Sequence, residues 1–233
     1  MNDFKSPGGS PLNTISPLNL HPHDVILFQG NSITDAGRNR LQSEPNAAPA
    51  LGDGYAGMIA AALAGKIPAP HLQIYNRAVS GDRLVDLIHR WERDTFPLLP
   101  DVLSILIGVN DLLQELLSRG RMDLGRYEEQ YQDLLSMTTE RLPYTRLVLC
   151  APFLFTGEGI PPEWQDEIKN QQEIVAGLAK NWGVIYVPFH QALSRAGEKY
   201  PRQRLLPDGV HPSPQGHQIL ADCWLEHVVG DRS

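Results

Sequence analysis

The sequence predicts an α/β protein whose central sheet is parallel and carries helices on both faces. Short apolar runs alternate along the chain with longer segments in which apolar residues recur at helical spacing. This alternation of strand and helix is typical of crossover connections, which make the strands parallel and place helices on either side of them. We therefore expect a three-layer α/β/α sandwich with a five-stranded parallel sheet.

The five predicted strands are short and strongly apolar, and polar turns follow several of them. They cover residues 25–28, 72–75, 102–107, 147–149 and 184–187. The predicted helices cover about residues 54–65, 82–95, 124–141, 165–182 and 213–229. Each helix follows a strand or closes the chain, as a parallel sheet with crossover helices requires.

Two of the predicted helices carry further local features. In the segment 82–95, apolar side chains fall at i, i+3, i+4 and i+7 on one stripe, with polar residues off it. The stripe is Leu84, Leu87, Ile88 and Trp91, and the residues off it are Asp86, Arg90 and Arg93. For the last helix, Ser213 is the expected N-cap and Pro214 the expected first helical residue.

The length of the chain fits a single domain. A chain of 233 residues could bury roughly 70% of its unfolded surface around one core, so we expect residues 24–233 to form one domain. Residues 1–23 are rich in Pro, Gly, Ser and Asn and have no hydrophobic period. This composition predicts an arm that is flexible or draped over the surface.

Composition disfavours several classes of partner. The 20 basic and 27 acidic residues give a formal net charge of −7, which disfavours nucleic acid and anionic membranes. Cys150 and Cys223 are the only cysteines and belong to no Cys-x-x-Cys or Cys/His cluster, so no disulfide framework or metal site is predicted. No run approaches the roughly 20 apolar residues of a membrane span, and no signal-peptide pattern is present. We expect a cytoplasmic protein without a cofactor, and a homo-oligomer stays open.

Polar groups follow the first three predicted strands and precede the last helix. In open parallel sheets, ligands bind beyond the carboxyl ends of the strands, where strand order reverses. The residues in these positions are Ser32, Gly81 and Asn110 after the strands, and Asp208 and His211 before the helix. Each alone has an ordinary interpretation as a turn, cap or surface residue. Together on one rim, they supply the groups that acyl transfer requires.

Each of these residue types has a chemical role in acyl transfer. A serine hydroxyl is a weak nucleophile until a base, here neutral His211, removes its proton during attack. Asp208 can accept the other ring N–H and hold the required tautomer. Gly81 lets a carbonyl oxygen approach a backbone N–H closely, and the side-chain amide of Asn110 can supply a further donor. These residues thus predict acyl transfer through an acyl-enzyme on Ser32, which requires no metal.

The segments that hold these residues resemble the sequence blocks of a known family. "GNSIT", "NRAVSGD", "GVND" and "DGVH" occur in this order and are similar to the four blocks of the SGNH hydrolases, the GDSL esterase/lipase superfamily, over about residues 24–229. The resemblance implies a flavodoxin-like SGNH hydrolase fold with Ser32 as nucleophile, His211 as base and Asp208 as its orienting partner. It also implies an oxyanion hole made by the amides of Ser32 and Gly81 and by Asn110.

Further stretches resemble one branch of this family. "ITDAGR", "LGDGYAGMI", "DLIHRWERD" and "VLSILIGVNDL" are similar to bacterial acetylxylan esterases and related carbohydrate acetylesterases, which implies a small-molecule or oligosaccharide acetyl ester as substrate. The residues expected to contact it are Asn31, Asp35, Arg38, Asn39 and Trp164. Asn31 departs from the family, which usually has Asp before the serine. The amide keeps the shape of Asp but lacks its negative charge.

Two other functions stay open from the sequence. A lysophospholipase or thioesterase would use the same catalytic groups on longer acyl chains. A non-catalytic flavodoxin-like binding module would use the Gly-Asn-Ser turn and the following helix start to hold an anion, but it would have no need of the Asp208 and His211 pair. Phe153 and Phe155, after the fourth strand, either wall the substrate or pack in the core.

Overall fold

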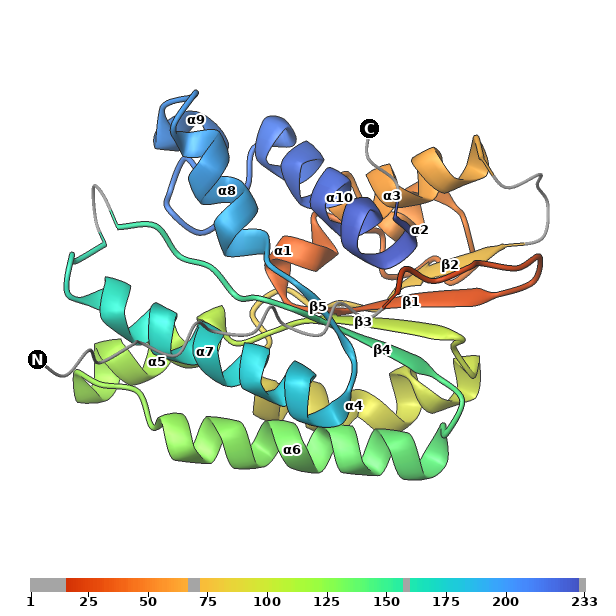
Figure 1. Cartoon of the computed structure of the whole chain (residues 1–233), viewed down its shortest axis with the longest axis horizontal. Coiled ribbons are helices and arrows are strands. Elements are labelled where there is room, and N and C mark those ends of the chain that lie inside the picture. The colour runs from red at the N-terminus through yellow and green to blue at the C-terminus, as the bar shows by residue number, and fades with distance from the viewer. Residues whose placement is uncertain (1–15, 67–71, 157–159, 231–233) are drawn as a thin grey trace, which may run out of the picture.

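The computed structural model describes residues 16–66, 72–156 and 160–230, and Figure 1 shows its arrangement. These residues contain a five-stranded parallel sheet. Its strands lie in the order β2 (Gln73–Asn76), β1 (Val25–Gly30), β3 (Val102–Leu106), β4 (Arg146–Cys150) and β5 (Ile185–Val187). Every predicted strand is confirmed, with ends that differ by one or two residues.

Helices cover both faces of the sheet (Figure 1). On one side lie α3 (Tyr55–Ala64), α8 (Phe189–Gly197) and α10 (Pro214–Val229), and on the other lie α4 (Leu84–Asp94), α6 (Leu124–Arg141) and α7 (Trp164–Trp182). The predicted three-layer α/β/α sandwich is therefore confirmed. The expected cap of α10 is also present, because Ser213 Oγ accepts a hydrogen bond from the amide of Gly216 at 3.2 Å and Pro214 is the first helical residue.

The structure contains helices that the sequence pattern does not predict. α5 (Val109–Arg119) begins within the polar turn after β3, and α8 follows β5 directly. The others are single turns: α1 (Ser32–Asp35), α2 (Ala48–Leu51), α9 (Arg202–Leu205) and the 3₁₀ turn η1 (Phe96–Leu98). A single turn is too short to show a hydrophobic period. The first turn of α5 escapes prediction because its polar residues follow a strand and resemble an ordinary loop.

The strand order reverses at β1. The chain passes from β1 to β2 on one side and then crosses back to β3 on the other. The helices that follow β1 and β3 lie on opposite faces of the sheet (Figure 1). In open parallel sheets, ligands bind beyond the carboxyl ends of the strands at such a reversal. Ser32 is the first residue of α1, directly beyond β1, and Asn110 lies in the first turn of α5, beyond β3.

Aromatic side chains fix β1 against the helices above it. The ring centroid of Phe28 on β1 lies 5.8 Å from that of Tyr55 on α3 and 5.4 Å from that of Trp224 on α10. Tyr55 also exchanges a hydrogen bond of 2.9 Å with Thr34 of α1. Because all these side chains are buried, the strand that leads into the Ser32 turn has little freedom to shift.

The described part of the predicted N-terminal arm lies against the domain. The amide of Leu18 donates to the carbonyl of Val228 at 2.6 Å, and Leu18 and Leu20 pack against the core. Residues 1–15 lie outside the described residues, so the flexible arm at 1–23 and the single domain at 24–233 stay predictions. Among the described residues, no helix is both long and apolar enough to cross a membrane.

Candidate active site

Ser32 is held in a tight turn between β1 and α1. The side chain of Asn31 caps α1, since its Oδ1 accepts a hydrogen bond from the amide of Ile33 at 3.1 Å. At Gly30, a Cβ atom would collide with the carbonyl of Leu106 on the neighbouring strand, so only glycine lets the two backbones approach this closely. The turn therefore presents Ser32 at the carboxyl end of the sheet.

Ser32, His211 and Asp208 form a continuous hydrogen-bonded chain. Ser32 Oγ lies 2.8 Å from His211 Nε2, and His211 Nδ1 lies 2.7 Å from Asp208 Oδ2. The structure thus brings together residues that are 179 positions apart in sequence. With the proton on Nδ1, this geometry leaves Nε2 free to accept the serine proton.

Asp208 is fixed in an orientation that suits a partner of the histidine. Its Oδ1 accepts hydrogen bonds from the amides of Val210 at 2.9 Å and His211 at 2.7 Å. Burial alone would raise the pKa of the Asp208 carboxyl, but the hydrogen bonds from the His211 ring and from the two amides outweigh it and lower the pKa. The carboxylate is therefore kept ionised beside the imidazole.

The loop that carries Asp208 and His211 is docked on the segment after β4. The amide of Phe155 donates to the carbonyl of Gly209 at 2.9 Å. Gly209 has a φ of 80°, and a Cβ there would collide with the carbonyl of Phe155. Phe153 and Phe155 are themselves buried, which favours core packing over a substrate wall for their side chains.

Gly81 and Asn110 lie on the turns that flank the Ser32 turn. Gly81 has a φ of 91°, a conformation that favours glycine. Asn110 Nδ2 donates to the carbonyl of Asp82 at 2.9 Å, which fixes its amide and leaves the second N–H available for a substrate oxygen. In the described residues, the amides of Ser32 and Gly81 donate to no protein acceptor. These groups have the chemistry that an oxyanion hole requires.

Two of the residues expected to contact substrate are buried and bonded to the protein. Asn31 is 1% exposed and Asp35 is 3% exposed. Asp35 Oδ2 accepts hydrogen bonds from the guanidinium of Arg40 and, at 2.9 Å, from the amide of Ser80. The structure thus gives Asn31 and Asp35 structural contacts in the turns that hold Ser32 and Gly81.

The other expected contact residues are more accessible. Arg38 is half-buried and donates from Nε to the carbonyl of Ala78 at 2.8 Å; burial lowers the pKa of its guanidinium to about 10. Asn39 is exposed. Trp164 opens α7 and packs partly buried against the core. Within the described ranges, no hydrogen bond or ring contact joins Trp164 to Ser32 or His211, so its role as a substrate contact stays a prediction.

A groove of about 450 Å³ lies beside Gly81 and Asn110, two of the three candidate oxyanion donors. It runs along one face of α5, where Asn110, Leu113, Gln114 and Leu117 recur at helical spacing. The opposite wall includes Gly81 and Arg83. A substrate carbonyl held by Gly81 and Asn110 would thus place part of the ester in this groove.

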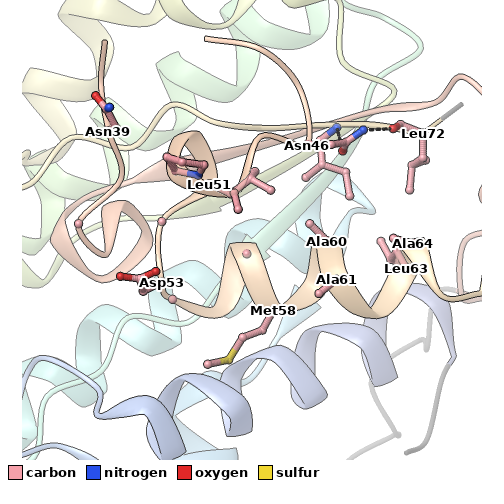
Figure 2. Close-up of a pocket in the computed structure, with 17 residues that line it drawn as sticks. Asn39, Asn46, Leu51, Asp53, Met58, Ala60, Ala61, Leu63, Ala64 and Leu72 are labelled. Carbon is pink, nitrogen blue, oxygen red and sulfur yellow. Dashed lines mark hydrogen bonds between the residues drawn. The ribbon is translucent and has the colours of Figure 1, made fainter. Parts of the chain in front are cut away.

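A larger cavity of about 890 Å³ lies between α3 and the edge strand β2. Figure 2 shows its lining, with Met58, Ala60 and Leu63 along α3 and Asn46 bonded to Leu72. The side chain and amide of Asn46 pair with the outer edge of β2, through Leu72 at 2.7 Å and Ile74 at 3.0 Å, which protects an otherwise open strand edge. None of the predicted catalytic residues lines this cavity.

Sequence patterns missed a charged group behind the site. Arg90 of α4 was expected with the polar residues off the apolar stripe, but it is buried and bonded to Asp82. A helical period separates polar from apolar positions and cannot show that a polar side chain turns inward. The one available indication is that Asp82, next to Gly81, precedes Arg90 by eight residues, about two helical turns.

Comparisons with known proteins identify the family to which this chain is similar. The model of the GDSL-like Lipase/Acylhydrolase family matches residues 28–219. An acetylxylan esterase from Geobacillus stearothermophilus is 30% identical over 207 residues, which cover 88% of this chain and 94% of that protein.

Two solved structures of related proteins are similar to this chain over most of its length. A crystal structure of the acetylxylan esterase from G. stearothermophilus has a TM-score of 0.81 and 29% identity, and covers 91% of this chain and 96% of that one. A protein from Parabacteroides merdae that is described as a GDSL-like lipase has a TM-score of 0.86 and 37% identity, and covers 91% of this chain and 98% of that one.

Proposed function

The chain belongs to the GDSL-like lipase/acylhydrolase family and is a carboxylic ester hydrolase; from this premise we propose that it removes acetyl groups from a carbohydrate through an acyl-enzyme on Ser32. The observation that carries the proposal is the hydrogen-bonded chain from Ser32 through His211 to Asp208, with distances of 2.8 Å and 2.7 Å. The name of the G. stearothermophilus relative supports acetyl as the acyl group and a xylan-type carbohydrate as the alcohol side.

In the proposed reaction, His211 Nε2 takes the proton of Ser32 as Oγ attacks the ester carbonyl. The negative charge on the carbonyl oxygen is stabilised by the amides of Ser32 and Gly81 and by the free N–H of Asn110. The bond to the sugar oxygen then breaks, and His211 returns the proton to that oxygen. Water, activated by the same histidine, attacks the acyl-enzyme and releases acetate. Asp208 holds the His211 tautomer throughout and accepts no proton.

A second candidate is a hydrolase of longer acyl chains, and the groove along α5 favours it. Leu113 and Leu117 line this groove next to Asn110, and Leu117 is 76% exposed. An acyl chain laid on these side chains would gain about 0.8 kcal/mol for each buried CH₂ group. The same groove could instead hold a sugar, which would use Arg83, Gln114 and Ser118 as hydrogen-bonding groups.

The test is a chain-length series of p-nitrophenyl esters, run beside acetylated xylo-oligosaccharides with free acetate measured. We expect kcat/KM to be highest for acetate and to fall with each added CH₂ pair, and we expect acetate release from the acetylated sugar. Leu117→Gln serves as a matched variant, because it should change the longer esters more than acetate. An optimum at octanoate or longer, with no acetate released from sugars, would transfer the assignment to the longer-chain candidate.

A further inference from the structure

One buried guanidinium lies behind the predicted oxyanion hole. Arg90, on the sheet-facing side of α4, is 8% exposed. Its Nε donates to Asp82 Oδ2 at 2.6 Å and its Nη2 to the carbonyl of Gly30 at 3.2 Å. Its Nη1 lies within hydrogen-bond distance of the Arg77 carbonyl at 2.7 Å and of Gln29 Oε1 at 2.8 Å. Arg90 thus binds the end of β1 and the turn after β2.

Two of these contacts, with the Gly30 carbonyl and the Asp82 carboxylate, lead to the three oxyanion candidates. The carbonyl of Gly30 belongs to the turn that presents the Ser32 amide, and it also accepts from the amide of Val79 at 3.1 Å. The Asp82 carboxylate is on the residue that follows Gly81. The Asp82 carbonyl, in turn, accepts the hydrogen bond from Asn110 Nδ2 at 2.9 Å. The donors on three different loops are therefore linked through one side chain.

We propose that Arg90 is a positioning residue for catalysis: it sets the relative placement of the Ser32, Gly81 and Asn110 donors without touching the substrate. The inference rests on the proposed function, because only an enzyme that stabilises an oxyanion depends on this placement. The planar guanidinium presents five N–H donors in a fixed fork, which matches acceptors on several sides at once. A lysine ammonium is a single point charge and cannot reach Gly30, Arg77 and Asp82 together.

A purely structural role would give a different result. A buried ion pair that only supports the fold changes stability when it is broken, and the folded fraction then keeps its turnover number. A positioning role lowers kcat in the folded protein, since misplacement of transition-state donors by a fraction of an ångström weakens their hydrogen bonds to the oxyanion. KM should change little, because the ground-state ester gains less from these donors.

The first experiment compares Arg90→Lys with the matched control Arg146→Lys. Arg146 likewise donates to a carboxylate, that of Asp24 at 2.9 Å, and to a carbonyl oxygen, that of Asp101 at 3.2 Å, but it lies on β4 at the opposite, amino end of the sheet. We expect Arg90→Lys to lower kcat by about 10- to 10²-fold with KM within about 2-fold, at a temperature where circular dichroism shows both variants folded. Arg146→Lys should keep the wild-type kcat.

The second experiment is a double-mutant cycle with Asn110→Ala. If Arg90 acts through the oxyanion donors, the loss in Arg90→Lys/Asn110→Ala is smaller than the product of the two single losses, since a donor already removed can no longer be misplaced. If Arg90→Lys lowers kcat by a route that does not involve the oxyanion donors, the two losses multiply. A folded Arg90→Lys with wild-type kcat, or a multiplicative cycle, would overturn the inference.

If Arg90→Lys does not fold, Asp82→Asn tests the interaction between Arg90 and Asp82 by changing the acceptor instead of the donor. This change removes one of the two carboxylate charges that pair with Arg90, leaves the other, Asp94 at 3.2 Å, in place, and keeps the Asp82 carbonyl that holds Asn110. We expect a lower kcat with little change in KM; an unchanged kcat would overturn the inference. Failure of the proposed function is seen separately, because the wild-type enzyme would then release no acetate from the acetylated sugars. An active wild type beside an equally active Asp82→Asn rejects only the role of Arg90.

Discussion

The Ser32 hydroxyl lies 2.8 Å from His211 Nε2 and makes no other hydrogen bond to the described residues. Its removal therefore costs the fold almost nothing, while it deletes the proposed nucleophile. We expect Ser32→Ala to lower kcat for an activated acetate ester by about 10⁴-fold or more, with an unchanged melting temperature. Both quantities are measured on the same preparation.

The matched control for this prediction is Ser194→Ala. Ser194 also faces a histidine, with its Oγ 3.4 Å from His190 Nε2, but it lies on α8 in none of the predicted catalytic turns. It should keep the wild-type rate. If Ser32→Ala hydrolysed the ester at a rate near the wild type, the acyl-enzyme would have to form on another residue.

The residues of the site differ in how far the sequence predicts them. Ser32, Gly81, Asn110, Asp208 and His211 stand in short turns with distinctive residue types, because groups that meet a substrate carry chemistry that packing alone does not require. Arg90 lies inside a helix and in no turn of distinctive residue types. Its position within α4 differs little in pattern from that of Arg93, which is exposed, and only the tertiary structure distinguishes them.

At the scale of elements, α5 holds the start of α4. Asp111, on α5, accepts hydrogen bonds from the amide of Leu84 with both carboxylate oxygens, at 3.0 Å and 3.1 Å. This contact places α4, and with it Arg90, against the turn that carries Asn110. The sequence predicts α4 from its apolar stripe but no helix over 109–119, so it could not predict a cap supplied across helices.

Burial of Asp111 has a consequence for stability. It raises the pKa of the carboxyl from 3.8 to about 7, and the hydrogen bonds from backbone amides only partly oppose it. Between about pH 4 and pH 7, the folded protein therefore binds a proton that the unfolded chain has lost. The free energy of unfolding accordingly falls as pH rises through this range, by at most about 4 kcal/mol from this group.

Asp111→Asn tests this consequence. Asparagine keeps an acceptor for the Leu84 amide and cannot ionise, so the variant should gain stability relative to the wild type as pH rises from 5 to 8. Urea unfolding at both pH values gives the difference, and Asp133→Asn, on the exposed face of α6, controls for the loss of a carboxylate. A stability difference between Asp111→Asn and the wild type that stays constant with pH would contradict the assignment.

At the scale of the molecule, the sequence predicts the layers of the fold and the rim of the sheet on which the candidate site lies. Buried parallel strands are continuous apolar runs, which pattern analysis detects well. Pattern analysis cannot predict how segments that are distant in sequence meet. α10, from the C-terminal end, packs against α3 and places His217 beside Gly54, where a Cβ atom would press on the imidazole ring. Contacts between such distant segments depend on the completed fold.

His217 makes the contact between α3 and α10 sensitive to acid. Its Nδ1 accepts a hydrogen bond from the amide of Tyr55 at 3.2 Å, which requires the neutral ring. Burial, with a smaller contribution from the charge of His211, lowers the pKa of His217 from 6.5 to about 4. The unfolded chain thus binds a proton between about pH 6.5 and pH 4 that the folded protein excludes. The free energy of unfolding should fall as pH drops through this range, by at most about 3 kcal/mol.

The variant His217→Gln separates this effect from catalysis. Glutamine retains an acceptor for the Tyr55 amide and does not titrate, so its acid unfolding, followed by fluorescence of the buried Trp91 and Trp224, should begin at lower pH than in the wild type. The esterase activity should still fall on acidification in both proteins, because protonated His211 cannot accept the Ser32 proton. Identical acid unfolding of the two proteins would show that His217 does not couple α3 to α10 through its neutral ring.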